Sequence, residues 1–222
     1  AAQYKCPAAP YEAALLVDSY LREHGRRDRV SMDFYAAEPG PMMVAGAAVS
    51  AGVRAMIESR DVRYHPEHQV KAIDPAARKI EFASGASAEF DLLLYVPPHR
   101  APAAVREAGL TNESGWVPVD RHTLATKQPG VYAVGDITVI PLKMGRPLPK
   151  AGVFAHGQAE VVANNIAHEW TGRGEPRRFE GEGMCFIETG GGRAGMGSGN
   201  FYAEPLPEVK LRQPGLLWHG AK

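Results

Sequence analysis

The sequence predicts an α/β fold with a parallel sheet, because helix-like and strand-like segments alternate along its first part. Residues 10–24 carry apolar side chains at helical spacing, and Pro10 suits the first turn of a helix, where a missing backbone N–H costs nothing. Residues 30–35 alternate like a strand, and residues 49–57 return to helical spacing. This order of elements is typical of a parallel α/β unit.

Short strands separated by turn residues follow this unit. Residues 69–73 and 79–83 each end at turn-forming residues, which predicts an antiparallel meander. Residues 91–96 form a continuous apolar run that stops at Pro97-Pro98, and we expect a strand buried on both faces of a sheet. The diproline is the best candidate for a domain boundary, because proline interrupts both helices and sheets.

The second half of the sequence combines one long helix with short strands. Residues 130–136 predict a short buried strand that ends in Gly135-Asp136. A long helix is expected at residues 151–170, and Gly172 suits its C-terminal end. Residues 184–188 are strand-like, and a glycine-rich turn and a tail interrupted by prolines follow them.

Composition excludes several classes of protein. The 222 residues include 25 Lys and Arg and 25 Asp and Glu, so a net charge of zero gives no electrostatic reason to expect a nucleic-acid partner. Two cysteines are too few for a disulfide-rich secreted scaffold or a zinc finger. No apolar run approaches the roughly 18 residues that suggest a membrane-spanning helix. The chain begins without an initiator Met or a signal region, so we expect it to be part of a longer protein.

Two motifs that suggest a ligand site are better explained as turns or loops. Gly190, Gly192 and Gly195 satisfy the G-x-G-x-x-G pattern of dinucleotide-binding loops. Such a loop must open a helix, and the residues after Gly195 are not helical in pattern, so a hairpin turn is favoured. His65 and His68 are three positions apart, but Pro66 between them prevents a helix from aligning them, and we expect a solvated loop and no metal site.

Cys6 precedes the first predicted helix, where unpaired N–H groups and the helix dipole favour a thiolate. Lys5 beside it acts in the same direction. The alternative is that Cys6 is a small buried apolar residue, as many free cysteines are. Cys185 lies in an apolar strand, where this alternative is stronger still. Spacing alone does not say whether the two sulfurs meet.

Gly135-Asp136 follows a predicted strand, and a carboxylate at such a position can accept hydrogen bonds from sugar hydroxyls. A simple turn is the alternative, because the dipeptide is common. The helix start at Lys150-Ala151-Gly152 favours the first interpretation, because N–H groups at a helix N-terminus can face a carbonyl or anionic edge of a ring.

Four blocks of residues carry a family resemblance: residues 5–14, 131–138, 148–156 and 184–190. They resemble the later part of sulfide:quinone oxidoreductases and of the flavoprotein subunit of flavocytochrome c sulfide dehydrogenase. Both belong to the FAD-dependent pyridine-nucleotide-disulfide oxidoreductase superfamily. The resemblance implies a Rossmann-like second domain, a returning segment of the FAD domain and a C-terminal interface piece, which we place at residues 1–98, 99–171 and 172–222.

The resemblance also implies roles for individual residues. Cys6 and Cys185 match the redox cysteines that carry electrons from sulfide to FAD, which passes them to a quinone. Gly135 and Asp136 match the contact with the ribityl chain of the flavin. Residues 150–152, namely Lys150, Ala151 and Gly152, match the segment beside the pyrimidine end of the flavin ring.

The sequence also departs from the family pattern. The FAD-binding glycine loop and the first strand–helix–strand unit are missing, so we expect this chain alone to bind FAD weakly or not at all. Where relatives that use NADH carry a glycine fingerprint, this chain has Cys6-Pro7-Ala8-Ala9-Pro10, which disfavours NADH.

Several questions stay open at this stage. The electron acceptor could be a cytochrome instead of a quinone, or the chain could be a non-catalytic α/β domain with structural cysteines. Leu216-Leu217-Trp218 is a candidate contact with a membrane surface, and a homo-oligomer is a further alternative. We therefore expect a location in the cytoplasm or at the periphery of a membrane.

Overall fold

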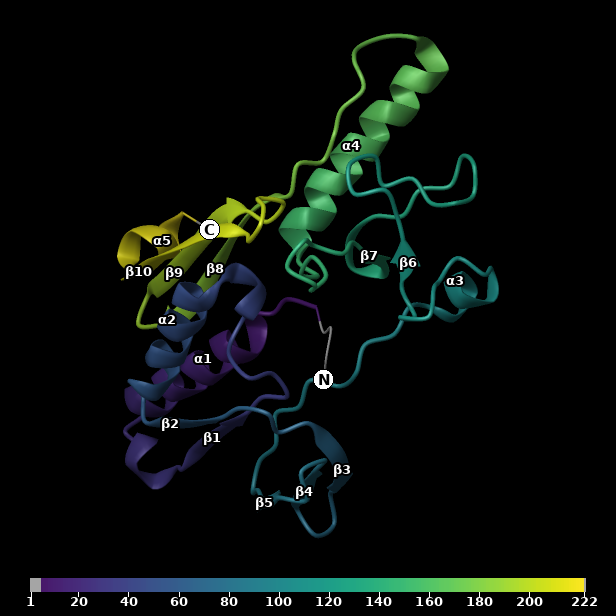
Figure 1. Ribbon diagram of the computed structural model, residues 1–222. Helices are drawn as coiled ribbons and strands as arrows, with labels where there is room; N and C mark the ends of the chain where they lie inside the picture. Colours follow the sequence, from purple (N-terminus) through teal and green to yellow (C-terminus); the bar gives the residue numbers. More distant parts are fainter. Residues whose placement is uncertain (1–4, 222) are drawn as a thin grey trace.

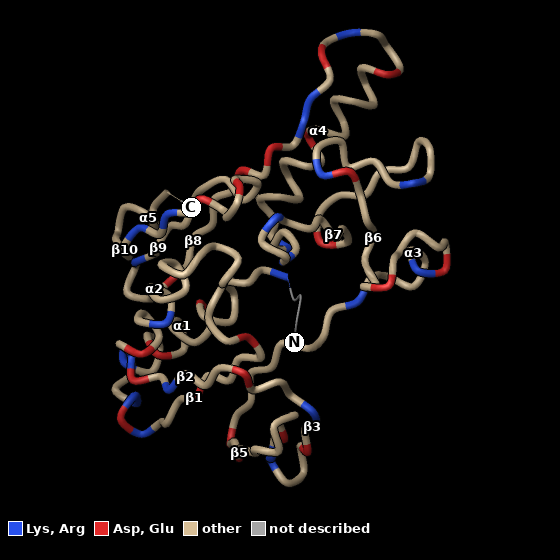
Figure 2. The backbone as a smooth tube through the Cα atoms, viewed as in Figure 1, with Lys and Arg blue, Asp and Glu red and all other residues tan. Residues whose placement is uncertain are grey.

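The structure is a computed structural model that describes residues 5–221, while residues 1–4 and 222 lie outside the described part. Figure 1 shows a layer of helices between two sheets, a small meander at one end of the molecule and a long helix that projects at the other end. Basic and acidic residues are interspersed along the chain in Figure 2, as a net charge of zero suggests.

The parallel α/β unit predicted for the first part of the chain is confirmed. Helix α1 (Ala9–Glu23) leads to strand β1 (Met32–Tyr35), and helix α2 (Ala47–Glu58) connects it to strand β2 (Val62–His65). The two strands pair in parallel from Met32 opposite Val62 to Tyr35 opposite His65. Buried apolar side chains from the two helices form the core of this unit: Tyr11, Leu15, Val49, Val53 and Ile57. Burying these side chains is the main source of stability of the unit.

The predicted antiparallel meander is also present. Strands β3 (Val70–Asp74), β4 (Lys79–Phe82) and β5 (Ser87–Glu89) pair in sequence order. Ile80 and Phe82 of β4 are buried, whereas the outer strands are mostly exposed. The central strand therefore supplies the apolar side of this small sheet.

The prediction of a buried strand at residues 91–96 is wrong. These residues lie in no strand, and the side chains of Leu92 and Leu94 are 78% and 64% exposed. A strand buried on both faces needs neighbouring strands and two covering layers. Within residues 5–221 the sheet of the parallel α/β unit contains only β1 and β2, and residues 91–96 join neither this sheet nor any other.

The middle of the chain contains short elements before the long helix. Helix α3 (Ala103–Glu107) precedes strands β6 (Val117–Pro118) and β7 (Thr138–Val139), which pair in parallel. The long predicted helix is confirmed as α4 (Gly152–Thr171), and Gly172 follows it in the left-handed conformation, with a φ of 66°. Among residues 5–221 there are also three short 3₁₀ helices, two in the first part of the chain and one here: η1 (Arg27–Arg29), η2 (Met43–Ala45) and η3 (Gly135–Ile137).

The prediction of a strand at residues 130–136 is wrong. Only Tyr132 makes an isolated bridge, to Ala125, and the chain turns into η3 at Gly135. Backbone groups of this segment bond instead across a tight loop, where Thr126 N–H donates to Val131 O and Ala133 N–H donates to Leu124 O. A local loop thus takes the hydrogen bonds that a longer strand would have used.

The C-terminal part is a three-stranded antiparallel sheet in the order β10-β9-β8. It consists of β8 (Glu182–Gly190), β9 (Arg193–Asn200) and β10 (Glu208–Gly215), and helix α5 (Leu216–Gly220) follows. The glycine run is the hairpin turn between β8 and β9, as the sequence predicts, with Gly190, Gly191 and Gly192 all at positive φ.

Residues 208–215, in the tail that prolines interrupt, form a strand that the sequence does not predict. Val209 and Leu211 alternate along β10 and pack against the core that lies between the two sheets. Pro214 falls where the pairing of β10 with β9 shifts register, a position at which a strand tolerates proline.

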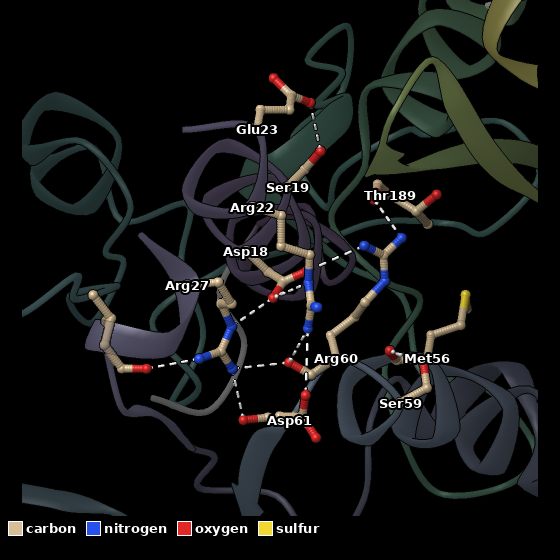
Figure 3. A network of polar contacts seen from close by, with 11 residues as sticks. Asp18, Ser19, Arg22, Glu23, Arg27, Met56, Ser59, Arg60, Asp61 and Thr189 are labelled. Atoms are coloured by element: carbon tan, nitrogen blue, oxygen red, sulfur yellow. Dashed lines mark hydrogen bonds and ion pairs between the residues drawn. The ribbon is translucent and has the colours of Figure 1, made fainter. Parts of the chain in front are cut away.

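A buried carboxylate joins the helical layer to the C-terminal sheet (Figure 3). The side chain of Asp18 on α1 is fully buried and accepts hydrogen bonds from Arg22 at 2.9 Å, Arg27 at 2.6 Å and Arg60 at 3.1 Å. Arg60 also donates to the carbonyl of Thr189 in β8. Burial alone would raise the pKa of Asp18, but the hydrogen bonds from the arginines hold it below its ordinary value.

Asp18→Asn tests how much this network stabilises the fold. The amide cannot balance three guanidinium groups, so we expect the free energy of unfolding in urea to fall by about 3–5 kcal/mol at neutral pH. The matched control is Asp28→Asn, since Asp28 is exposed on the neighbouring 3₁₀ helix. Equal and small losses in both variants would contradict the assigned importance of Asp18.

Candidate functional site

The residues that the sequence singles out converge on Lys150. The main chain of Lys150 forms a parallel bridge with Lys5, and Cys6 N–H donates to Lys150 O at 2.5 Å. Cys6 lies just before α1 and Lys150 just before α4, so this contact joins the starts of two helices that are far apart in the sequence. The cysteine segment and the predicted helix-start segment are therefore neighbours.

The side chain of Lys150 lies inside the protein, with only 8% of the residue exposed. Its Nζ donates to Asp136 O at 2.6 Å and to Thr138 O at 2.8 Å, and it lies 3.6 Å from the centre of the Trp116 ring. Burial lowers the pKa of Lys150 to about 8, and the negative charge of Asp136 opposes this shift. Lys150 therefore connects the cysteine segment to the Gly135-Asp136 turn.

The Gly135-Asp136 turn packs against α4. Gly135 N–H donates to the buried Gln158 Oε1 at 2.6 Å. Gly135 has a φ of +72°, and a Cβ there would lie 2.9 Å from Ala155 Cβ. Only glycine suits both the backbone conformation and this close approach. The sequence predicts the Gly-Asp pair but gives no signal for Gln158, because that contact depends on the packing of α4.

The N-terminus of α4 carries the other predicted cofactor residues. Ala151 is the N-cap, and no side chain caps the helix there within residues 5–221. Gly152 is exposed, and a Cβ on it would meet open space. The first N–H groups of α4 thus lie at the positive end of the helix dipole, close to the Gly135-Asp136 turn.

Both cysteines are free, and they lie in the same neighbourhood. Cys6 is exposed, whereas Cys185 is half-buried in β8. Burial raises the pKa of the Cys185 thiol, and negative charge on Cys6 and on Glu12 acts in the same direction. Glu12 itself accepts a hydrogen bond from Glu188 N–H at 3.1 Å, a contact that joins the first turn of α1 to β8. Helix α1, which Cys6 precedes, packs against strand β8, which carries Cys185.

Phe154 joins α4 to the strand that carries Cys185. Its ring is buried and meets the ring of Phe201 edge-on at 5.0 Å. A Cβ on Gly183 would overlap the Phe154 ring, so the absence of a side chain at Gly183 lets the ring lie on β8. Neither Gly183 nor Trp116 is identified by sequence reasoning, because each matters through a partner that is distant in the sequence.

The expectation of a solvated loop at His65 and His68 is wrong for His65, which is the last residue of β2. His65 Nε2 lies 2.7 Å from the carboxylate of Asp33, and its ring stacks on Tyr35. His68 packs edge-on against Phe82. Within residues 5–221, no group of three His, Cys, Asp or Glu residues is arranged to hold a metal ion.

Comparison with protein families adds an independent observation. The family model described as "Pyridine nucleotide-disulphide oxidoreductase" matches residues 19–163. This match includes the last part of α1, the segment from β1 to β2, the meander, Gly135-Asp136 and Lys150, but it includes neither cysteine.

Individual relatives match most of the chain. The mitochondrial sulfide:quinone oxidoreductase of Dictyostelium discoideum is 27% identical over 190 residues, which are 83% of this chain and 40% of the relative. The sulfide-quinone reductase of Aquifex aeolicus is 27% identical over 215 residues, which are 90% of this chain and 48% of the relative. The chain thus spans about half the length of these relatives.

Solved structures share the fold. The X-ray structure of the sulfide:quinone oxidoreductase from Aquifex aeolicus has a TM-score of 0.79 and 24% sequence identity, and the match covers 95% of this chain and 52% of that one. A FAD-dependent pyridine nucleotide-disulphide oxidoreductase from Desulfovibrio vulgaris has a TM-score of 0.55 and 20% identity, and the match covers 84% and 46% of the two chains. These similarities support the α/β fold that the sequence predicts.

Gly183→Ala tests the close contact between α4 and β8. The added methyl group would force the buried Phe154 ring to move, so we expect the free energy of unfolding in urea to fall by about 1–3 kcal/mol. Gly197→Ala in the neighbouring strand is the control, because a Cβ there meets nothing within 4 Å. Equal effects of the two substitutions would contradict the proposed close packing.

Proposed function

Because the chain belongs to the pyridine nucleotide-disulphide oxidoreductase family, we propose that it is part of an FAD-dependent oxidoreductase that oxidises sulfide and reduces a quinone. The observation that carries this proposal is the convergence of Cys6, Lys150 and Gly135-Asp136 in one small region. The names of the relatives from Dictyostelium discoideum and Aquifex aeolicus support the choice of sulfide and quinone.

The residues present suit one part of FAD, the flavin and its ribityl chain. The carboxylate of Asp136 would accept hydrogen bonds from ribityl hydroxyls. The uncapped N–H groups at Ala151 and Gly152 would face the pyrimidine edge of the ring, where the positive end of the helix dipole favours negative charge. Bound FAD would supply the capacity to accept two electrons.

Residues 5–221 do not provide a site for the pyrophosphate of FAD. Such a site needs a glycine-rich turn at the start of a helix. The glycine run at 190–192 is a hairpin between strands, and prolines occupy the segment before α1. We therefore propose that a further FAD-binding part works together with this chain, and the uncovered apolar segment at residues 91–96 supports this proposal.

The two cysteines would handle the sulfur in this proposal. Attack of sulfide on a disulfide between Cys6 and Cys185 would break the S–S bond, form a persulfide on one cysteine and release the other as a thiolate. The two electrons lost by the sulfide sulfur remain on the cysteine sulfurs after this step. Exposure of Cys6 gives sulfide access, and the half-buried position of Cys185 limits its contact with water.

The electron acceptor and the location of the protein are also proposals. A cytochrome is the alternative acceptor to the quinone. Leu216 and Leu217 on α5 are 65% and 71% exposed, which supports contact with a membrane surface that holds a quinone. No helix within residues 5–221 is both long enough and apolar enough to cross a bilayer.

FAD binding by the isolated chain tests the proposal that a further part of the protein binds the pyrophosphate of FAD. We expect the purified 222-residue chain to be colourless and to bind added FAD weakly or not at all, because residues 5–221 offer no pyrophosphate loop. Absorbance near 450 nm after gel filtration, compared with total protein, would measure this. Recovery of one FAD per chain would refute the prediction.

Substitution of the cysteines in a longer protein that contains the FAD-binding part tests the proposed activity. We expect Cys6→Ser and Cys185→Ser each to lower sulfide-dependent quinone reduction by at least about 100-fold, since neither variant can form the disulfide. Asp28→Asn serves as a control that leaves the cysteines intact. Undiminished activity in both serine variants would favour the alternative of a non-catalytic domain with structural cysteines.

A further inference from the structure

We propose that Lys150 is a positioning residue that holds the Cys6 segment and the Gly135–Thr138 turn together as one unit. The inference rests on the proposed function in one respect, namely that Cys6 is the redox thiol and Asp136 the flavin contact. In that case Lys150 fixes the distance between the Cys6 segment and the residues that contact the flavin, and its own side chain touches neither the thiol nor the flavin.

The main chain of Lys150 supports the Cys6 side of this unit. Cys6 has a φ of 52°, a left-handed conformation that a residue with a side chain rarely adopts. Such a conformation persists only when surrounding contacts hold it. The bridge between Lys5 and Lys150 and the hydrogen bond from Cys6 N–H to Lys150 O provide these contacts.

The side chain of Lys150 supports the turn. Asp136 O and Thr138 O lie at the end of η3, where unpaired carbonyl groups need donors. The Lys150 ammonium has three N–H groups, and two of them satisfy these carbonyls. The Trp116 ring covers the amine at 3.6 Å, an arrangement that favours a positive charge over the face of the ring.

Through these contacts the Lys150 ammonium is bound by groups of the protein and not by a cofactor. A lysine that served a cofactor with its ammonium would direct at least one N–H group toward open space. Instead, Lys150 is buried against Trp116, Asp136 and Thr138. Its contribution to a bound flavin would therefore come through the Gly135-Asp136 turn and the α4 start, which it holds in place.

Amide hydrogen exchange on the isolated chain tests the coupling. In Lys150→Met we expect exchange at the Cys6 and Thr138 amides to become at least about 10-fold faster, because the turn loses its donor and releases the segment bonded to it. The Val53 amide in the core of α2 should be unchanged, and so should all three amides in the control Lys143→Met, where Lys143 is exposed. Lys150→Arg should restore part of the protection, because a guanidinium can also donate to two carbonyls.

The other outcomes overturn the proposal. Faster exchange at Thr138 alone would mean that Lys150 supports the turn without coupling it to Cys6. A uniform increase that includes Val53 would mean a general loss of stability, and unchanged exchange would mean no positioning role. None of these measurements uses FAD or sulfide, so their failure would be distinct from failure of the proposed activity.

Trp116 fluorescence tests the placement of the ammonium directly. In a chain that also carries Trp170→Phe and Trp218→Phe, Trp116 is the only tryptophan. Its emission should change in a step centred near pH 8, as the amine facing the ring loses its proton, and Lys150→Met should abolish the step. Among the described residues, Asp136 is the charged group that acts on this amine, whereas Lys5 and Cys6 contact the main chain of Lys150, so the step should persist in Cys6→Ser. If the chain that carries only Trp170→Phe and Trp218→Phe shows no such step, the placement of the Lys150 ammonium over the Trp116 ring is overturned.

Discussion

The contact between α1 and β8 is the interaction on which the rest of the structure depends, and Asp18 is its centre. Three arginines from different segments share one buried carboxylate, so the positions of α1, the end of α2 and the β8–β9 hairpin are fixed together. Gly190 permits this contact, because a Cβ there would overlap the side chain of Ser19. The same contact brings Cys6, at the entry to α1, near Cys185 on β8. The buried charge network thus lies in the same α1–β8 interface that joins the segments carrying the two cysteines.

Local patterns predict the elements whose burial is decided within a short segment. Helices α1, α2 and α4 follow from apolar spacing and end residues, and the meander follows from its turns. Strand β9 is harder to predict, because its glycines have little strand propensity. It forms since two partner strands supply hydrogen bonds on both edges, and Gly199 lets the backbone of β10 approach closely. Residues 91–96 show the opposite case, in which a strand-like pattern has no partner.

The candidate site also contains some residues that the sequence indicates and others that it does not. The residue types at Cys6, Cys185 and Gly135-Asp136 carry recognisable chemistry, and family resemblance alone indicates roles for them. Trp116 and Gln158 carry no such signal, since a tryptophan or a glutamine at those positions is unremarkable in sequence. They matter because the fold places one over the Lys150 amine and the other against Gly135 N–H. The sequence thus indicates the candidate reactive residues, whereas the residues that position them, Trp116 and Gln158, are identified only by tertiary packing.

The uncovered apolar segment at residues 91–96 has a consequence for the behaviour of the chain in concentrated solution. An exposed apolar segment that lies in no strand can pair with the same segment on another copy. Pro97 and Pro98 lack N–H groups, so a ladder that started at Leu92 could not continue beyond Val96. The diproline would therefore confine any pairing between copies to the few residues before Pro97.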